Sequence, residues 1–180
     1  MILRLLVINI TNISKRQSQF EVFPMLSMIF ACDLDGAIGK DGDLPWKQSS
    51  DLRHFKMTTI NKTVVMGRKT WDSLPSGGLP NRRNIVMSRT PREDVEIMNY
   101  EQVLQLSQNE DIIIIGGGEI YSLFIQHCKE IFRTIIHTNV EGADTFAPDI
   151  SKMGFVLIGE NHQPAGDHDQ HPMTFQHYIC

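Results

Sequence analysis

The chain of 180 residues is long enough for one domain with a sizeable hydrophobic core and short for two. Hydrophobic residues make up 41% of it and charged residues 21%, the balance of an ordinary globular protein. The formal net charge of -4 does not give the basic field that general nucleic-acid or anionic-membrane binders need. We therefore expect no nucleic-acid partner and no membrane partner.

The first 24 residues differ from the rest of the chain. An apolar run over 1–10 is followed by a polar stretch over 11–19. No small-residue cleavage site follows the apolar run, which argues against a secretory signal, and no run approaches the roughly 18 apolar residues that cross a bilayer. We expect an N-terminal extension over 1–24 on which the active site does not depend, and one functional domain over 25–180.

Beyond residue 24, short apolar runs alternate with segments of helical periodicity. Strands are predicted where apolar residues run between turn residues, over 26–33, 62–67, 84–88, 111–115, 132–140, 155–158 and 173–179. Helices are predicted over 51–57, 68–74, 100–107 and 119–128, with Ser49 and Ser50 as N-cap candidates for the first. This alternation predicts an α/β fold: a three-layer sandwich with a central mixed, mainly parallel sheet and a C-terminal antiparallel hairpin.

Three cysteines, Cys32, Cys128 and Cys180, are widely spaced and form no C-x-x-C pair that would indicate zinc binding or redox chemistry. Free thiols are typical of a reducing compartment, so we expect the protein in the cytoplasm.

Two segments far apart in the chain carry the main functional signal. Residues 38–46, Ile-Gly-Lys-Asp-Gly-Asp-Leu-Pro-Trp, form a glycine-rich loop, and Asp51 follows in the first turn of the predicted helix. Residues 115–121, Ile-Gly-Gly-Gly-Glu-Ile-Tyr, form a strand end that breaks into three glycines before another helix. Together they resemble the dihydrofolate reductase family, and the likeness runs from about residue 25 to the C-terminus. The resemblance implies NADPH-dependent reduction of the pteridine ring of dihydrofolate.

Asp51 is the candidate catalytic acid. An acid in a first helical turn is also favoured by the helix dipole alone, so its position is not decisive without its context. The resemblance implies that Asp51 binds the pteridine ring and promotes protonation at N5, that Thr134 hydrogen-bonds this carboxylate, and that Trp46 orders a water beside it. In a mostly apolar pocket a lone carboxyl group should have a raised pKa through desolvation.

The remaining substrate residues follow from the same resemblance. Arg82 matches the arginine that clasps the α-carboxylate of the folate glutamate tail, and its planar fork suits a carboxylate. The adjacent Arg83 leaves the assignment open by one residue. The predicted substrate-binding residues are Ile29, Asp51, Leu52, Phe55, Leu74, Leu79, Arg82 and Thr134.

On the cofactor side, Gly116, Gly117 and Gly118 do not have G-x-G-x-x-G spacing, so the dinucleotide fingerprint is absent here. The order strand, glycines, helix still lets backbone N–H groups approach a pyrophosphate. The resemblance also implies a cis peptide bond between the first two glycines, and closure of the loop over 37–46 on the nicotinamide.

A 2′-phosphate needs paired cations, and three basic residues at strand ends, Arg68, Lys69 and Arg89, could surround one. Because these cations could bind a 2′-phosphate, NADPH is the expected cofactor. Taken singly, each of the three could also be an ordinary solvated surface residue. The predicted cofactor-binding residues are Ala31, Ile38, Gly39, Asp43, Leu44, Gly67, Arg68, Lys69, Thr70, Ser88, Arg89, Ile115, Gly116, Gly117, Gly118, Glu119, Ile120 and Tyr121.

The segment over 162–177 is rich in His and Asp, but its spacing matches no standard metal site, and a polar hairpin turn explains it. We expect no metal.

The expected activity is hydride transfer from NADPH to C6 of 7,8-dihydrofolate with protonation at N5, by a monomer. Two alternatives stay open: a pyrimidine reductase of the riboflavin pathway, and a non-catalytic module that retains the fold.

Overall fold

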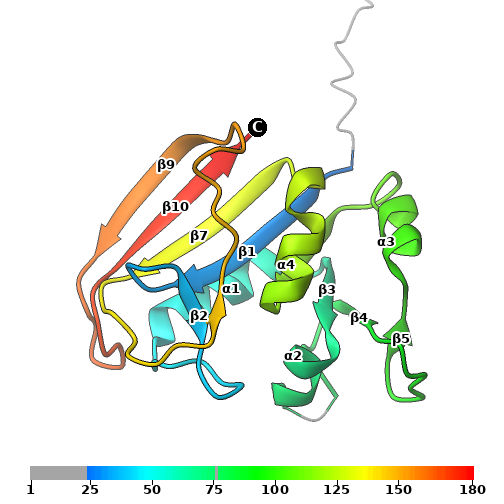
Figure 1. Cartoon of the computed structure of the whole chain (residues 1–180), viewed down its shortest axis with the longest axis horizontal. Helices are drawn as coiled ribbons and strands as arrows, with labels where there is room; N and C mark the ends of the chain where they lie inside the picture. Colours follow the sequence, from blue (N-terminus) through cyan, green and yellow to red (C-terminus); the bar gives the residue numbers. More distant parts are fainter. Residues whose placement is uncertain (1–23, 76) are drawn as a thin grey trace, which may run out of the picture.

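The computed structural model describes residues 24–75 and 77–180 (Figure 1). Except for Pro24, the extension predicted over 1–24 lies outside the described residues.

An eight-stranded sheet forms the centre of the molecule, in the order β5-β4-β3-β6-β1-β7-β10-β9 (Figure 1). Neighbours from β5 to β7 are parallel, and β10 is antiparallel to both β7 and β9. The predicted mixed, mainly parallel sheet with a C-terminal antiparallel hairpin is confirmed. Its strands are β1 Leu26–Cys32, β3 Thr63–Gly67, β4 Arg83–Met87, β5 Glu96–Ile97, β6 Ile112–Gly116, β7 Glu130–Ile136, β9 Val156–Gln163 and β10 Met173–Ile179.

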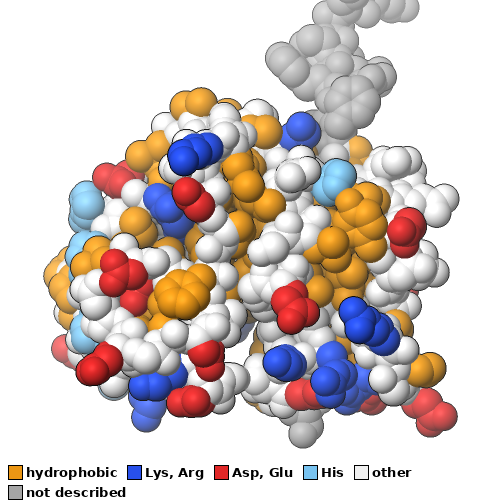
Figure 2. Space-filling model, viewed as in Figure 1, with side chains coloured by type: hydrophobic (Ala, Val, Ile, Leu, Met, Phe, Trp, Pro, Cys, Tyr) orange, Lys and Arg blue, Asp and Glu red, His pale blue; other side chains and the backbone are white. Residues whose placement is uncertain are grey.

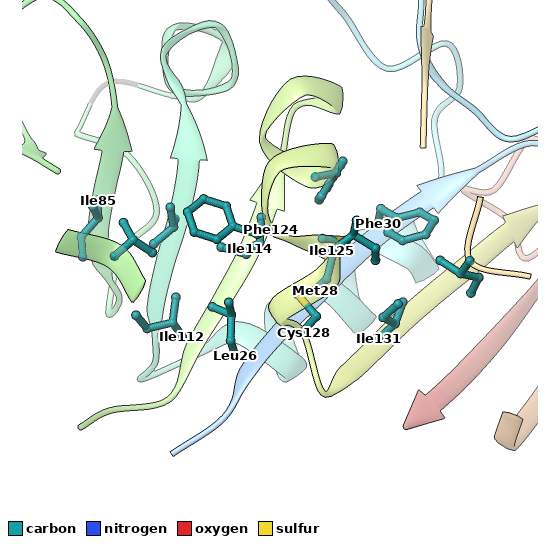
Figure 3. Close-up of a cluster of buried hydrophobic side chains, with 14 of the residues drawn as sticks. Leu26, Met28, Phe30, Ile85, Ile112, Ile114, Phe124, Ile125, Cys128 and Ile131 are labelled. Carbon is teal, nitrogen blue, oxygen red and sulfur yellow. The ribbon is translucent and has the colours of Figure 1, made fainter. Parts of the chain in front are cut away.

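Helices cover both faces of this sheet and complete the three layers. On one face, buried side chains of β1, β3, β4 and β6 pack against α1 and α2. On the other face the same strands pack against α3 and α4, and Figure 3 shows Met28 and Ile114 of the sheet beside Phe124 and Ile125. The helices are α1 Ser49–Thr59, α2 Arg68–Ser73, α3 Tyr100–Leu106 and α4 Gly118–Phe124, which continues as the 3-10 helix η2 Ile125–His127.

A separate two-stranded sheet pairs β2 Ala37–Gly39 with β8 Thr145–Phe146. After β2 the chain reverses through Asp41 and Gly42, both with positive φ, and residues 40 and 43 exchange backbone hydrogen bonds. Such a two-residue turn with both central residues left-handed is the preferred hairpin turn for an Asp-Gly pair.

All the predicted strands and helices are present, but several of their ends were wrong. The strand predicted over 132–140 ends at Ile136, because the chain then turns and the Val140 N–H donates to the Asp33 carboxylate at 2.8 Å. Strand β9 continues to Gln163, beyond the predicted 155–158. The prediction ended too early because this exposed edge strand has no apolar alternation beyond Ile158. Ser49 and Ser50 are not the N-cap of α1, which is Gln48.

The three cysteines are free, with Cys32 and Cys128 buried and Cys180 exposed. Within 24–75 and 77–180, no helix is long and apolar enough to cross a membrane, and no cluster of three or more His, Cys, Asp or Glu side chains could hold a metal ion.

Candidate active site

The two motifs found in the sequence meet at the carboxyl ends of the parallel strands, where ligands bind in open α/β sheets. Strand β6 ends at Gly116, and α4 begins at Gly118. The peptide bond between Gly116 and Gly117 is cis, as the resemblance implied. A Cβ atom at Gly118 would lie 3.0 Å from Thr145 Cγ2 and 3.1 Å from the Phe146 carbonyl oxygen. Glycine is therefore needed for β8 to approach this turn.

Two further predicted residues pack beside the glycine turn. The Thr70 hydroxyl lies 3.4 Å from the Cβ position of Gly116 and 3.5 Å from that of Gly117. At the end of β3, a Cβ on Gly67 would lie 3.0 Å from Ile120 Cγ1. The turn is thus packed closely against β3 and α2, which brings these predicted cofactor-binding residues together.

The first loop reaches the glycine turn through the β2–β8 sheet. Ile38 Cδ1 lies 3.8 Å from the Cβ position of Gly118. Beyond β2, the Lys40 ammonium group donates to the Glu141 carbonyl at 2.8 Å, and the Asp41 N–H donates to the Asp144 carboxylate at 2.9 Å. The predicted residues Asp43 and Leu44 follow this turn and are exposed.

A cavity of about 900 Å³ opens between the first loop, α4 and β8. The space-filling view shows this face hollowed between the β2–β8 region and the α2–α4 region (Figure 2). Of the predicted residues, Lys69, Gly118 and Glu119 line it. Gly42, which also lines it, belongs to the loop over 37–46 that was expected to close on the nicotinamide. The sequence did not point to the other lining residues, which are Ser122, Leu123, Asp144, Thr145 and Phe146. No signal marked residues 144–146, because β8 has two residues inside a polar stretch.

Basic side chains gather at the α2 end of the same face (Figure 2). Arg68 makes a long, exposed contact with Asp72, at 3.9 Å. Arg89 is exposed, and the neighbouring Ser88 hydroxyl donates to the Thr90 carbonyl at 2.8 Å. By contrast, Arg92 lies 2.6 Å from Asp72 and 2.9 Å from Asp94, so its charge is already neutralised. Arg68 and Arg89 are the better candidates for a phosphate.

Asp51 lies in the first turn of α1, on the face of the sheet opposite α4. Burial of its carboxyl group raises its pKa from 3.8 to about 6, hydrogen bonding from the Thr134 side chain lowers it, and the nearby Asp169 charge raises it. The predicted rise through desolvation is confirmed. Thr134 is buried on β7, directly opposite Ala31 of β1.

Most of the other predicted residues on the substrate side are apolar and buried or partly buried. Trp46 is buried in one cluster with Ile136 and Met173. The Tyr121 hydroxyl donates to the Ile29 carbonyl at 2.8 Å, which fixes α4 to the central strand. Of the other predicted substrate residues, Phe55, Leu74 and Leu79 are partly buried beside the α1–α2 face of the sheet, together with the buried Ile115, whereas Leu52 is 56% exposed. None of these residues, and not Asp51, lines the 900 Å³ cavity.

Arg82 and Arg83 have very different surroundings. Arg83 bonds to Glu96 and Glu110, each at 2.8 Å, so both sides of its guanidinium are occupied. Arg82 donates to the Thr59 hydroxyl at 2.8 Å and lies 5.9 Å from the centre of the Phe55 ring. Within the described part of the chain Arg82 makes no ion pair, so its charge remains available to a ligand carboxylate.

A glycine turn at parallel strand ends, a basic group beside it and one desolvated carboxyl group on the opposite face of the sheet are the features expected of an α/β reductase that uses a nicotinamide cofactor. The family model for dihydrofolate reductase matches residues 25–179. The chain belongs to the dihydrofolate reductase family.

Individual relatives agree with the family match. The chain is 35% identical over 156 residues to dihydrofolate reductase type 3 of Salmonella typhimurium, covering 84% of this chain and 95% of the relative. It is 35% identical over 161 residues to the dihydrofolate reductase of Enterococcus faecium, with the same two shares. A solved structure of dihydrofolate reductase from Enterococcus faecalis, complexed with NADP(H) and RAB-propyl, superposes with a TM-score of 0.78 at 32% identity, covering 87% of this chain and 96% of that one.

The chain is therefore an NADPH-dependent oxidoreductase that reduces 7,8-dihydrofolate to 5,6,7,8-tetrahydrofolate.

Proposed function

We propose that Asp51 is the group that binds the pteridine ring and promotes protonation of N5. The observation that carries this is the Asp51 carboxyl group, desolvated so that its pKa rises to about 6, beside the buried Thr134. When ionised, such a carboxylate accepts two hydrogen bonds from the N–C–NH₂ edge of a pterin, in a geometry with which water competes poorly. Its negative charge stabilises the protonated imine at N5, whose proton comes ultimately from solvent.

We propose that the glycine turn and the basic residues beside it hold NADPH. The bare backbone at Gly118 borders a cavity of about 900 Å³, and Lys69 brings a positive charge to the same cavity, which suits a pyrophosphate. Arg68 and Arg89 would contact the 2′-phosphate. When bound, NADPH supplies the hydride that passes from nicotinamide C4 to substrate C6. The first loop is joined to the segment just before β8 by the hydrogen bonds from Lys40 to Glu141 and from Asp41 to Asp144. It would cover this side and exclude water.

We propose that Arg82 rather than Arg83 binds the carboxylate of the glutamate tail. Its bond to Thr59 and its position over Phe55 support this, because they orient the guanidinium at the end of the helix that carries Asp51. Arg83 is engaged by two glutamates and would have to leave them.

We propose that the protein acts as a monomer in the cytoplasm. Every proposed site residue lies within one chain, so the site does not need a second copy. The three free cysteines favour a reducing compartment. Sedimentation at working concentration tests the first point, and fractionation of the source cells tests the second.

Kinetics of the Asp51→Asn variant test the catalytic role. Loss of NADPH absorbance is followed with and without dihydrofolate. At pH 7 we expect hydride transfer to fall by roughly 10²- to 10⁴-fold, because an amide cannot stabilise the protonated pterin. The loss should shrink at low pH, where the substrate arrives already protonated. Unchanged far-UV circular dichroism shows that the fold is intact, and a wild-type rate at pH 7 would contradict the assignment.

A further inference from the structure

The helix that carries Asp51 has no N-terminal cap from its own N-cap residue. Gln48 occupies the N-cap position, but its side chain makes no capping hydrogen bond to α1. Its amide oxygen accepts instead from the backbone of Gln170, at 2.6 Å, and of His171, at 3.0 Å. The first backbone N–H groups of an α-helix have no partner within the helix, so those of α1 need one from elsewhere.

Asp169, on the connection between β9 and β10, supplies that partner. One of its carboxylate oxygens accepts from the Ser50 N–H at 2.9 Å, and the other accepts from the Ser50 hydroxyl at 2.6 Å. The second oxygen also accepts from the Gly166 N–H at 3.2 Å, which fixes the carboxylate within its own connection. The backbone adds to this contact, because the Ser49 N–H donates to the His168 carbonyl at 3.4 Å. A residue 119 positions away thus performs the role of an N-cap side chain.

We propose that Asp169 is a positioning residue for the reduction: it caps α1 from a distant connection and holds a fixed negative charge beside Asp51. The contact is made at Ser50, the residue immediately before Asp51, so the same bonds that cap the helix set the direction in which Asp51 points. The proposal rests on Asp51 being the carboxyl group that serves the substrate.

The effect of the Asp169 charge on Asp51 depends on which neighbours of Asp51 are ionised. Burial raises the pKa of the Cys32 thiol to about 11 and also raises that of the Tyr121 phenol, so both are neutral at pH 7. One turn further along α1, burial lowers the pKa of His54, whose ring is then neutral as well. The bonds from Ser50 lower the pKa of Asp169, which therefore stays ionised. Among these groups, Asp169 is the charged one, and its charge disfavours ionisation of Asp51.

Two substitutions separate the cap from the charge. Asp169→Asn keeps a side-chain oxygen that can accept from the Ser50 N–H, since Asn is as good an N-cap as Asp, but it removes the charge. We expect the acidic limb of its kcat/KM pH profile to move down by roughly half a unit, the effect of one neighbouring charge under water-like screening. Asp169→Ala removes both functions, so we expect the same movement and a KM for dihydrofolate raised several-fold. A wild-type KM in Asp169→Asn together with a raised KM in Asp169→Ala would show that the capping hydrogen bond to α1 positions Asp51.

Asp167→Asn is the matched control, because it removes one charge from an exposed position on the same connection. It should leave both KM and the pH profile unchanged. NADPH affinity, measured by fluorescence, reports whether each variant is folded; if the Ala variant does not fold, the profile of the Asn variant still decides the matter. Wild-type profiles for Asp169→Asn, or an equal movement for Asp167→Asn, would overturn the proposal.

A direct titration distinguishes this failure from failure of the proposed function. The Asp51 carboxyl carbon is followed by NMR in the full-length wild-type and Asp169→Asn proteins. If Asp51 titrates at lower pH in the variant while Asp51→Asn retains wild-type rate, the charge coupling holds and the assigned role of Asp51 fails. If Asp51→Asn is inactive and the titration does not move, the role of Asp169 alone is wrong.

Discussion

The ionised form of Asp51 destabilises the folded chain, and its removal should therefore stabilise the protein while it impairs catalysis. Burial raises the pKa of this carboxyl group from 3.8 to about 6. The difference of about two units corresponds to about 3 kcal/mol of unfolding free energy, as an upper value for a single group in the absence of ligand.

The sign follows from proton binding. Between about pH 4 and pH 6 the folded chain holds a proton at Asp51 that the unfolded chain has already released, so stability falls as the pH rises through this range. Above about pH 6 the loss is complete. Asparagine carries no charge at any pH. Asp51→Asn should accordingly gain up to about 3 kcal/mol near pH 8 and gain nothing from this source near pH 4.

Urea unfolding at the two pH values, without substrate or cofactor, measures this difference. Comparing the variant with the wild type at each pH cancels the titration of every other group, and Asp167→Asn corrects for the general effect of removing one negative charge. A stability gain of the same size at both pH values would refute the reasoning, because the gain would then not come from the desolvated charge. So would a loss of stability near pH 8.

Arginine side chains are expected to recognise both ligands. Arg82→Ala should raise the KM for dihydrofolate and leave NADPH affinity unchanged, since its contact with the tail is formed in the ground state and the transition state alike. Arg83→Ala should change neither constant, and the opposite result would move the role to Arg83. Arg68→Ala and Arg89→Ala should weaken NADPH binding by roughly 1–3 kcal/mol and NADH binding much less. Equal losses for the two cofactors, measured by fluorescence titration, would mean that neither arginine contacts the 2′-phosphate.

The central strands could be predicted because their signal is local. The apolar run over 112–115 is buried on both faces of the sheet, and the strand at 63–66 is buried likewise, so burial and β-branched composition coincide. The break at Gly116 was equally readable, because three consecutive glycines do not continue a strand. Strands β2, β5 and β8 were missed, since two or three residues give no periodicity to detect.

The roles of site residues could be predicted where the family resemblance supplied them. They could not be predicted where they depend on contacts between residues far apart in the chain. The choice between Arg82 and Arg83 needed the ion pairs of Arg83, whose partners Glu96 and Glu110 lie on other elements. The cap of α1 was assigned to local serines, whereas Asp169 reaches it from the C-terminal hairpin. Helix propensity rules look at neighbouring residues and cannot find a cap of this kind.

The position of β1 in the middle of the sheet has a consequence for the order in which the chain is assembled. Leu26 pairs with Ile112 of β6, and Ser27 pairs with Glu130 of β7, so both neighbours of the first strand are synthesised long after it. A nascent chain holds β1 with neither edge paired until β6 has emerged, and the other edge stays open until β7 follows. Long loop closures of this kind are slow and leave apolar strand edges exposed in the meantime. Fragments that end before Glu130 should therefore bind chaperones and aggregate.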